Sequence, residues 1–302
     1  MPIVRTVIAS YFYNFYSPSE CELRLYLKYH GTPAEPPSAY AQVLFRLGQR
    51  HEKNHLKTIP RYVDLSNSPS EAMREELNRG TAVIYQGTLK ASTVIDNHPV
   101  EVVGIPDFVI REEAGFVIRD CKISRHADEN RHPEITRQLQ IYGWLLEKVT
   151  GNRPLRLEVF KGDCKLETLD YVGEPIALSH LQSLIKIISL PDEPYSPVGW
   201  SKCGNCGYNK LCWARATDQH DVAMVYDLDQ NLAHRLHQIG VTTIEQLINN
   251  YSTKELSELK RPWGSREQKV GKKAERILLQ AEAMIRKKEL IIMRPGIPQS
   301  NN

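Results

Sequence analysis

Residues 105–124, IPDFVIREEAGFVIRDCKIS, form two mostly apolar runs on either side of a short polar break at 112–114. This pattern predicts a β-hairpin, in which successive side chains of each strand point to opposite faces. Asp120 and Lys122 then share one face, and a tight turn brings Asp107 close to Asp120 across the strand pair. Because an unpaired buried charge is costly, we expect these three groups to be paired, solvated or bound to a metal ion.

The chemistry of the hairpin side chains favours a divalent cation. Two neighbouring carboxylates suit Mg²⁺ or Mn²⁺, which are hard ions that prefer oxygen ligands. A nearby ammonium can orient or help deprotonate a metal-bound water, or neutralise charge developing on a phosphate. The alternative for an Asp-x-Lys pair is a solvent-facing salt bridge at a sheet edge.

Composition sets broad limits on the protein. The chain has 302 residues, 41% apolar and 25% charged, which is ordinary for a soluble globular protein, and the length fits one large and one small domain or two medium ones. The net charge is only +3, but residues 260–288 hold ten Lys or Arg against three Glu, a local balance of +7. The sequence shows no signal-peptide pattern and no apolar run of membrane-spanning length. We therefore expect a cytoplasmic protein with no membrane partner.

The order of elements predicts a mixed α/β fold. A helical pattern over 39–58 precedes a β-rich segment over 81–124, and a second helical pattern ends at Gly151. Two strand patterns and another helix follow, which implies a mixed sheet with helices on both faces. After Thr217 the chain changes to short polar helices. We expect a domain over 1–217 and a small all-α domain over 218–302.

Several segments of the first domain resemble the PD-(D/E)XK nuclease core in its RecB-like branch. The hairpin matches through GIPDFVI and RDCK, RLGQRHEKNHL resembles the helical Gly-x-x-His element, and RQLQIYGWLL resembles the Gln-x-x-x-Tyr element. The resemblance covers roughly residues 7–217. It implies a three-layer α/β/α, restriction-endonuclease-like core that hydrolyses DNA. Position 120 carries Asp rather than Glu. Both residues occur at this position across the superfamily, so the difference implies no loss of activity.

The resemblance also implies roles for single residues. Asp107 and Asp120 would bind the metal, and Lys122 would activate water. The resemblance implies two additional metal ligands, His51 and the carbonyl of Cys121. It also implies that Gln138 and Tyr142 form a supporting pair, which would contact the nucleic-acid backbone and brace the metal site. Two alternatives stay open, since His51 could be a satisfied interior residue and the Gln138–Tyr142 pair could simply lie at the core edge.

Cysteines near both ends of the first domain suggest a second metal site. Cys203, Cys206 and Cys212 have the spacing Cys-x₂-Cys-x₅-Cys, which is typical of metal ligands, and Cys21 is the best candidate for a fourth. This set resembles the four-cysteine iron–sulfur site of AddB-type and CRISPR-associated RecB-like exonucleases. The resemblance implies a 4Fe-4S cluster. The alternative is a structural Zn²⁺ site, since both metals accept four thiolates.

The C-terminal segment resembles helix-hairpin-helix elements, with Gly turns at Gly240 and Gly271. Such turns bind DNA phosphates through backbone amides and lysines. The residues predicted to contact phosphate are Lys269, Lys272, Lys273 and Arg276. The alternatives are a helical bundle with a solvated basic face, or a module that docks a partner protein.

Together these patterns predict a metal-dependent DNA nuclease, and more narrowly an exonuclease, acting in DNA repair, recombination or CRISPR adaptation. DNA is the expected partner, together with CRISPR-adaptation or repair proteins. The alternative is a non-catalytic DNA-binding or assembly subunit that keeps the nuclease fold and the metal cluster. A zinc-containing RNA-binding module is a third possibility.

Overall fold

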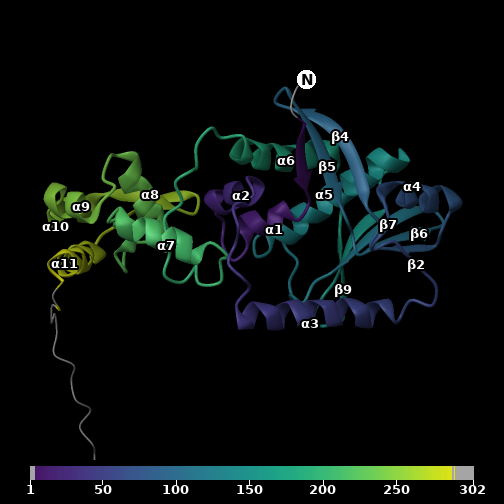
Figure 1. Ribbon diagram of the computed structural model, residues 1–302, viewed down its shortest axis with the longest axis horizontal. Helices are drawn as coiled ribbons and strands as arrows, with labels where there is room; N and C mark the ends of the chain where they lie inside the picture. The colour runs from purple at the N-terminus through teal and green to yellow at the C-terminus, as the bar shows by residue number, and fades with distance from the viewer. Residues whose placement is uncertain (1–3, 288, 290–302) are drawn as a thin grey trace, which may run out of the picture. The chain divides into compact units, whose positions relative to one another are not determined.

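A computed structural model describes residues 4–287 and residue 289. The chain forms two compact units, Met1–Pro194 and Tyr195–Asn302 (Figure 1). This division falls earlier than the boundary predicted near Thr217. The reason is that Val198 and Ala216, on either side of the cysteine-rich segment, pack into the hydrophobic core of the second unit.

The larger sheet of the first unit is mixed, as the sequence predicts. Its strands lie in the order β2 (Val63–Asp64), β3 (Val83–Tyr85), β6 (Phe108–Glu112), β7 (Gly115–Cys121), β8 (Arg156–Phe160) and β9 (Leu166–Leu169). β2 and β3 are parallel, as are β7 and β8, whereas the other neighbours are antiparallel. The predicted hairpin is formed by β6 and β7, which pair Phe108 with Arg119 and Glu112 with Gly115.

Helices cover both faces of this sheet. On one face, His55 of α3 (Ala39–Leu56) stacks on Phe160 with ring centroids 3.9 Å apart, and Arg119 of β7 lies 3.2 Å from the His55 ring. Because strand side chains alternate, Ile118 points the other way, into the core beneath α5 (Pro133–Thr150). The result is the three-layer α/β/α arrangement predicted from the sequence (Figure 1).

A second sheet and the remaining helices complete the first unit. The sheet consists of β1 (Arg5–Ile8), β5 (His98–Gly104) and β4 (Leu89–Ile95) in that order. The remaining helices are α1 (Tyr11–Tyr16), α2 (Glu22–Tyr29), α4 (Ser70–Arg79) and α6 (Glu174–Ile188). α5 packs against α1, α6 and both sheets, and its Trp144 is fully buried. Gly143 permits a close approach, since a Cβ there would lie 2.6 Å from Cδ2 of Tyr171.

The second unit is mainly helical, but it differs from the all-α expectation by one hairpin. The helices are α7 (Asn209–Asp218), α8 (Gln230–Gln238), α9 (Ile244–Asn250), α10 (Thr253–Glu258) and α11 (Lys273–Arg286), with a 3₁₀ turn at Val222–Met224. The antiparallel strands β10 (Lys260–Trp263) and β11 (Arg266–Lys269) join at Gly264, whose φ of 60° favours glycine. In neither unit is any described helix long and apolar enough to cross a membrane.

Candidate active site

The two hairpin aspartates lie close together. The strand register that pairs Phe108 with Arg119 places Asp107 opposite Asp120 at the open end of the hairpin. Asp107 Oδ2 accepts a hydrogen bond of 2.7 Å from the backbone N–H of Cys121, which holds the carboxylate against β7. Asp120 is 2% exposed. A pair of acids in such a buried position needs a compensating positive charge.

Lys122 supplies one such charge. Its Nζ lies 2.5 Å from Asp120 Oδ2 and 5.1 Å from the ring centroid of Tyr13 in α1. Burial by itself lowers the pKa of Lys122, but the opposing effect of Asp120, together with Tyr13 and Asp107, outweighs it and raises the pKa well above its usual range. Lys122 is therefore a charged ammonium at neutral pH.

One lysine does not satisfy both acids. Burial raises the pKa of Asp107, the negative charge of Asp120 raises it further, and Lys122 offsets only part of this effect. Within the described structure, Asp120 Oδ2 is buried and has no hydrogen bond, so its contact with Lys122 is an ion pair alone. A cation placed between the carboxylates would relieve their repulsion and use the oxygen that has no hydrogen bond.

The donor set fits Mg²⁺ or Mn²⁺. Among the described residues there is no group of three or more His, Cys, Asp or Glu side chains arranged to hold a metal ion. Mg²⁺ does not require one, because proteins commonly bind it through one or two carboxylates, with water and substrate phosphate completing the shell. Asp107 and Asp120 are such a pair, and they are the residues that would hold the ion.

The additional ligands expected from the sequence have other contacts. His51 Nε2 lies 3.0 Å from the carbonyl oxygen of Phe160, and its ring stacks on that of Phe160 at 4.9 Å. In a neutral imidazole this contact places the proton on Nε2 and leaves Nδ1 as the nitrogen able to bind a metal. The backbone N–H of Cys121 holds Asp107, and burial raises the pKa of the Cys121 thiol, so the thiol is protonated at neutral pH.

Gln138 and Tyr142, four residues apart in α5, contact each other. Gln138 Nε2 donates a hydrogen bond of 2.8 Å to the Tyr142 hydroxyl, and both side chains are buried. Burial raises the pKa of Tyr142 well above its usual range, and Asp120 adds to the effect, which identifies Asp120 as a neighbour. In the described residues Gln138 Oε1 has no hydrogen bond. Their burial favours bracing the acid pair over contacting a nucleic-acid backbone directly.

Glu52 is a further neighbour of the acid pair. Glu52 Oε1 accepts hydrogen bonds from the Tyr85 hydroxyl at 2.7 Å and from Gln86 Nε2 at 2.6 Å. Its negative charge contributes to the raised pKa of Asp107. In the sequence, the position of Glu52 directly after His51 was the one indication of this role. Its partners, on β3 and in the loop after it, lie more than thirty residues away along the chain.

The four predicted cluster ligands belong to both units. Cys21 belongs to the first unit, where its Sγ caps α2 by accepting from Arg24 N at 3.4 Å. Cys203, Cys206 and Cys212 belong to the second unit and are half-buried. The described residues do not gather these side chains into a group that could hold a metal ion.

Of the four residues predicted to contact phosphate, two form ion pairs with acidic residues and two lie at the start of a helix. Lys269 Nζ pairs with Glu258 at 2.5 Å, and Arg276 Nε pairs with Asp227 at 2.6 Å. Lys272 and Lys273 instead lie at the start of α11. The first predicted hairpin turn lies between α8 and α9, where Gly240 has a φ of 84°. The second, at Gly271, follows a β-strand rather than a helix.

Comparisons with known proteins address the fold and the hairpin together. The crystal structure of SSO0001 is similar over 70% of this chain and 88% of that chain, with 14% sequence identity and a TM-score of 0.39. A search of curated proteins found no match. The family model of the PD-(D/E)XK nuclease superfamily matches residues 30–213, well over half of the chain, and this range includes the whole hairpin and α5. The mixed sheet and its acid pair thus belong to a restriction-endonuclease-like core, and the chain is a member of the PD-(D/E)XK nuclease superfamily.

Proposed function

We propose that this protein is a nuclease that hydrolyses phosphodiester bonds of DNA with Mg²⁺ or Mn²⁺. The observation that carries the proposal is the buried face on which Asp107, Asp120 and Lys122 meet, with Nζ 2.5 Å from Asp120 Oδ2. Membership of the superfamily over 30–213 supports the same activity. A purely structural salt bridge between Lys122 and Asp120 would not account for the second acid, Asp107, on the same face.

Each residue of this face has a proposed part in hydrolysis. A bound divalent ion supplies the charge that polarises a phosphodiester and lowers the pKa of a water molecule. Asp107 and Asp120 hold the ion. Lys122, as a charged ammonium, orients the attacking water and neutralises charge developing on the phosphate. Gln138 and Tyr142 hold the acid pair in place from α5.

His51 and the Cys121 carbonyl are proposed as further ligands that join when metal and DNA bind. Ligation by His51 would use Nδ1, because Nε2 contacts the Phe160 carbonyl. Glu52 is an additional candidate, since its charge already acts on Asp107. Replacing His51 or Glu52 should therefore weaken metal-dependent activity without removing the acid pair.

The test is cleavage of end-labelled linear DNA, single- and double-stranded, in EDTA, Mg²⁺ or Mn²⁺. We expect the wild-type protein to cleave only with a divalent ion, and Asp107→Asn and Lys122→Met to lose at least about a hundredfold in rate. Lys148→Met is the matched control, because it removes a lysine from another ion pair, with Glu174 at 2.7 Å. Wild-type protein that binds DNA but never cleaves it would favour the non-catalytic assembly subunit instead.

Narrower assignments rest on the sequence resemblance. We propose a RecB-like exonuclease that acts in the cytoplasm, with DNA repair, recombination or CRISPR-adaptation proteins as partners. Product lengths from the same cleavage assay separate exonuclease from endonuclease action, since shortening by single nucleotides or short oligomers from labelled ends marks the former.

The cysteine site is a separate proposal, carried by the Cys-x₂-Cys-x₅-Cys spacing. We propose that Cys21, Cys203, Cys206 and Cys212 hold a 4Fe-4S cluster. Iron, acid-labile sulfide and zinc analysis of anaerobically purified protein tests it. Iron and sulfide in equal amounts would support the cluster, zinc would support the alternative, and protein free of all three would refute both.

A further inference from the structure

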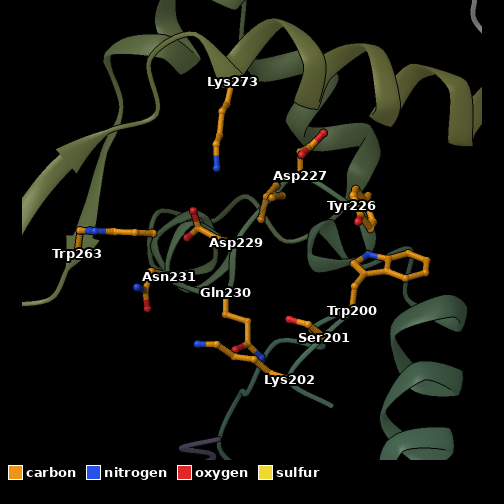
Figure 2. A pocket seen from close by; sticks show the side chains of 12 residues that line it. Trp200, Ser201, Lys202, Tyr226, Asp227, Asp229, Gln230, Asn231, Trp263 and Lys273 are labelled. Carbon is orange, nitrogen blue, oxygen red and sulfur yellow. The ribbon is translucent and has the colours of Figure 1, made fainter. Parts of the chain in front are cut away.

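The second unit contains a cavity of about 370 Å³ that lies outside the proposed nuclease centre. Three exposed aromatic side chains line it: Trp200, Tyr226 and Trp263, which are 54%, 66% and 53% exposed. Figure 2 shows Trp263 on one side of the cavity, Trp200 and Tyr226 on the other, and Lys273 projecting between them. Large aromatic rings rarely gather on a surface without a ligand or partner.

Both tryptophans are held in position by specific contacts. Trp263 lies against the guanidinium of Arg261, 5.0 Å from the ring centroid, and Arg261 is itself 3% exposed and paired with Asp229 at 2.7 Å. The Trp200 indole donates a hydrogen bond of 3.2 Å to the Met224 carbonyl. Trp200 also packs edge-on against Trp213, with ring centroids 4.7 Å apart. Rings fixed before binding lose little conformational entropy when a ligand stacks on them.

The charges around the cavity favour an anionic ligand. Both carboxylates that line it are already engaged: Asp227 accepts from Arg276 and Gln280, and Asp229 accepts from Arg261 and from the N–H of Leu232. Lys202 and Lys273 also line the cavity, and among the described residues neither is in an ion pair. Two free ammonium groups repel a cationic ligand and attract a phosphate.

We propose that this cavity binds single-stranded DNA, with unstacked bases lying against Trp200 and Trp263 and the backbone phosphates contacted by Lys202 and Lys273. Base–aromatic stacking combined with lysines along the backbone is how proteins hold single strands without reading sequence. The inference rests on the proposed function for the choice of DNA, and it adds the strand state that the enzyme holds. Of the four residues predicted to contact phosphate, Lys273 is the one that lines this cavity.

The experiment measures binding of fluorescein-labelled oligothymidine to the full-length protein in EDTA by fluorescence anisotropy. The oligomer is longer than the roughly 4–16 nucleotides that typical single-strand sites cover. We expect tight binding to oligothymidine and at least about tenfold weaker binding to an abasic strand with the same number of phosphates. A duplex, whose bases are already stacked, should also bind more weakly. Equal affinity for the abasic strand or for the duplex would overturn the proposal.

Variants assign the effect to the cavity. Trp263→Ala and Trp200→Ala should each weaken oligothymidine binding about tenfold, whereas Trp263→Phe, which keeps an aromatic face, should retain most of it. Lys273→Ala should weaken binding and reduce its salt dependence, and Lys254→Ala is the matched control because it removes an exposed lysine of α10 outside the cavity. Unchanged affinity in both tryptophan variants, or an equal loss in the Lys254 control, would refute the site.

This binding assay and the cleavage assay can fail separately. Binding in EDTA needs no catalysis, and Lys122 does not line the cavity. If Lys122→Met cleaves DNA normally while Trp263→Ala loses binding, the proposed catalytic centre is wrong and the cavity assignment stands. The reverse pattern would remove the cavity assignment alone.

Discussion

The buried ion pair of Lys122 and Asp120 predicts a large loss of stability when its positive partner is removed. Nζ and Oδ2 are 2.5 Å apart, and their side chains are 17% and 3% exposed. At an effective dielectric constant of about 20, two unit charges at this distance attract each other by about 7 kcal/mol. Desolvation of both ions offsets part of this, so removing one partner of such a pair costs about 3–5 kcal/mol.

We therefore expect Lys122→Met, which keeps most of the aliphatic chain, to lower the free energy of unfolding by about 3–5 kcal/mol at pH 8 in EDTA. For a unit of this size the melting temperature should fall by roughly 10 °C. Because the folded-state pKa of Lys122 is raised, the contribution is fully present below its unfolded pKa of about 10.4, and it would be lost only as pH rises through the folded value.

Urea unfolding of wild type, Lys122→Met, Asp120→Asn and the double variant measures this directly. The double variant should lose less stability than the two single variants together, with a coupling of at least about 1 kcal/mol. Lys148→Met, which removes a more exposed pair with Glu174, should change stability by less than about 1 kcal/mol. A Lys122→Met protein as stable as wild type, or a coupling near zero, would show that the ion pair does not stabilise the fold.

Gly143→Ala should lower the free energy of unfolding by about 1–3 kcal/mol, because a Cβ would lie 2.6 Å from Tyr171 Cδ2; urea unfolding identical to wild type would contradict that approach. Burial, with help from Arg119, lowers the pKa of His55 to about 4, so stability from the neutral ring is complete above about pH 6.5 and lost as pH falls toward 4. His55→Phe should make the free energy of unfolding depend less on pH over this range, and an unchanged pH dependence would contradict the lowered pKa of His55. Mn²⁺ affinity, measured by calorimetric titration, should rise with pH because the ion displaces the proton that burial and Asp120 favour on Asp107; a pH-independent affinity would argue against a site there.

The hairpin could be read from the sequence because its information is local. The polar break at 112–114 fixes the turn, and the two-residue period of a strand then sets which side chains face each other. Gln138 and Tyr142 are one helical turn apart, so helix geometry alone places them on one face, where their side chains contact each other. In both cases the regular geometry of a strand pair or a helix is enough to predict which residues lie side by side.

Contacts between distant segments could not be read in this way. The Phe160 carbonyl beside His51 is 109 residues away in sequence, and Glu52 reaches the acid pair only because α3 lies on the sheet. Nothing in the periodicity of 39–58 distinguishes a histidine that faces a carbonyl from one that faces a metal. The sequence therefore identified the helix and its polar residues but not the neighbour of each side chain.

The second unit differs from its sequence prediction for local physical reasons, and the sequence signals for them were visible but ambiguous. Residues 260–269 interrupt the helical pattern, and the interruption is a β-hairpin in which Gly264 takes the left-handed turn position. Arg261 is buried there beneath Trp263, which a composition-based reading of the segment as a solvated basic face does not anticipate. The predicted boundary lies near Thr217, whereas the compact units divide after Pro194, because residues around the cysteines pack with the second core.

We propose that Asp107 and Asp120 together hold one divalent cation for hydrolysis. Anomalous scattering at the manganese edge from crystals soaked in Mn²⁺ tests this most directly. We predict a peak about 2 Å from oxygens of both carboxylates, absent in Asp107→Asn crystals. A manganese peak elsewhere in protein that cleaves DNA, with none at these two aspartates, would contradict it.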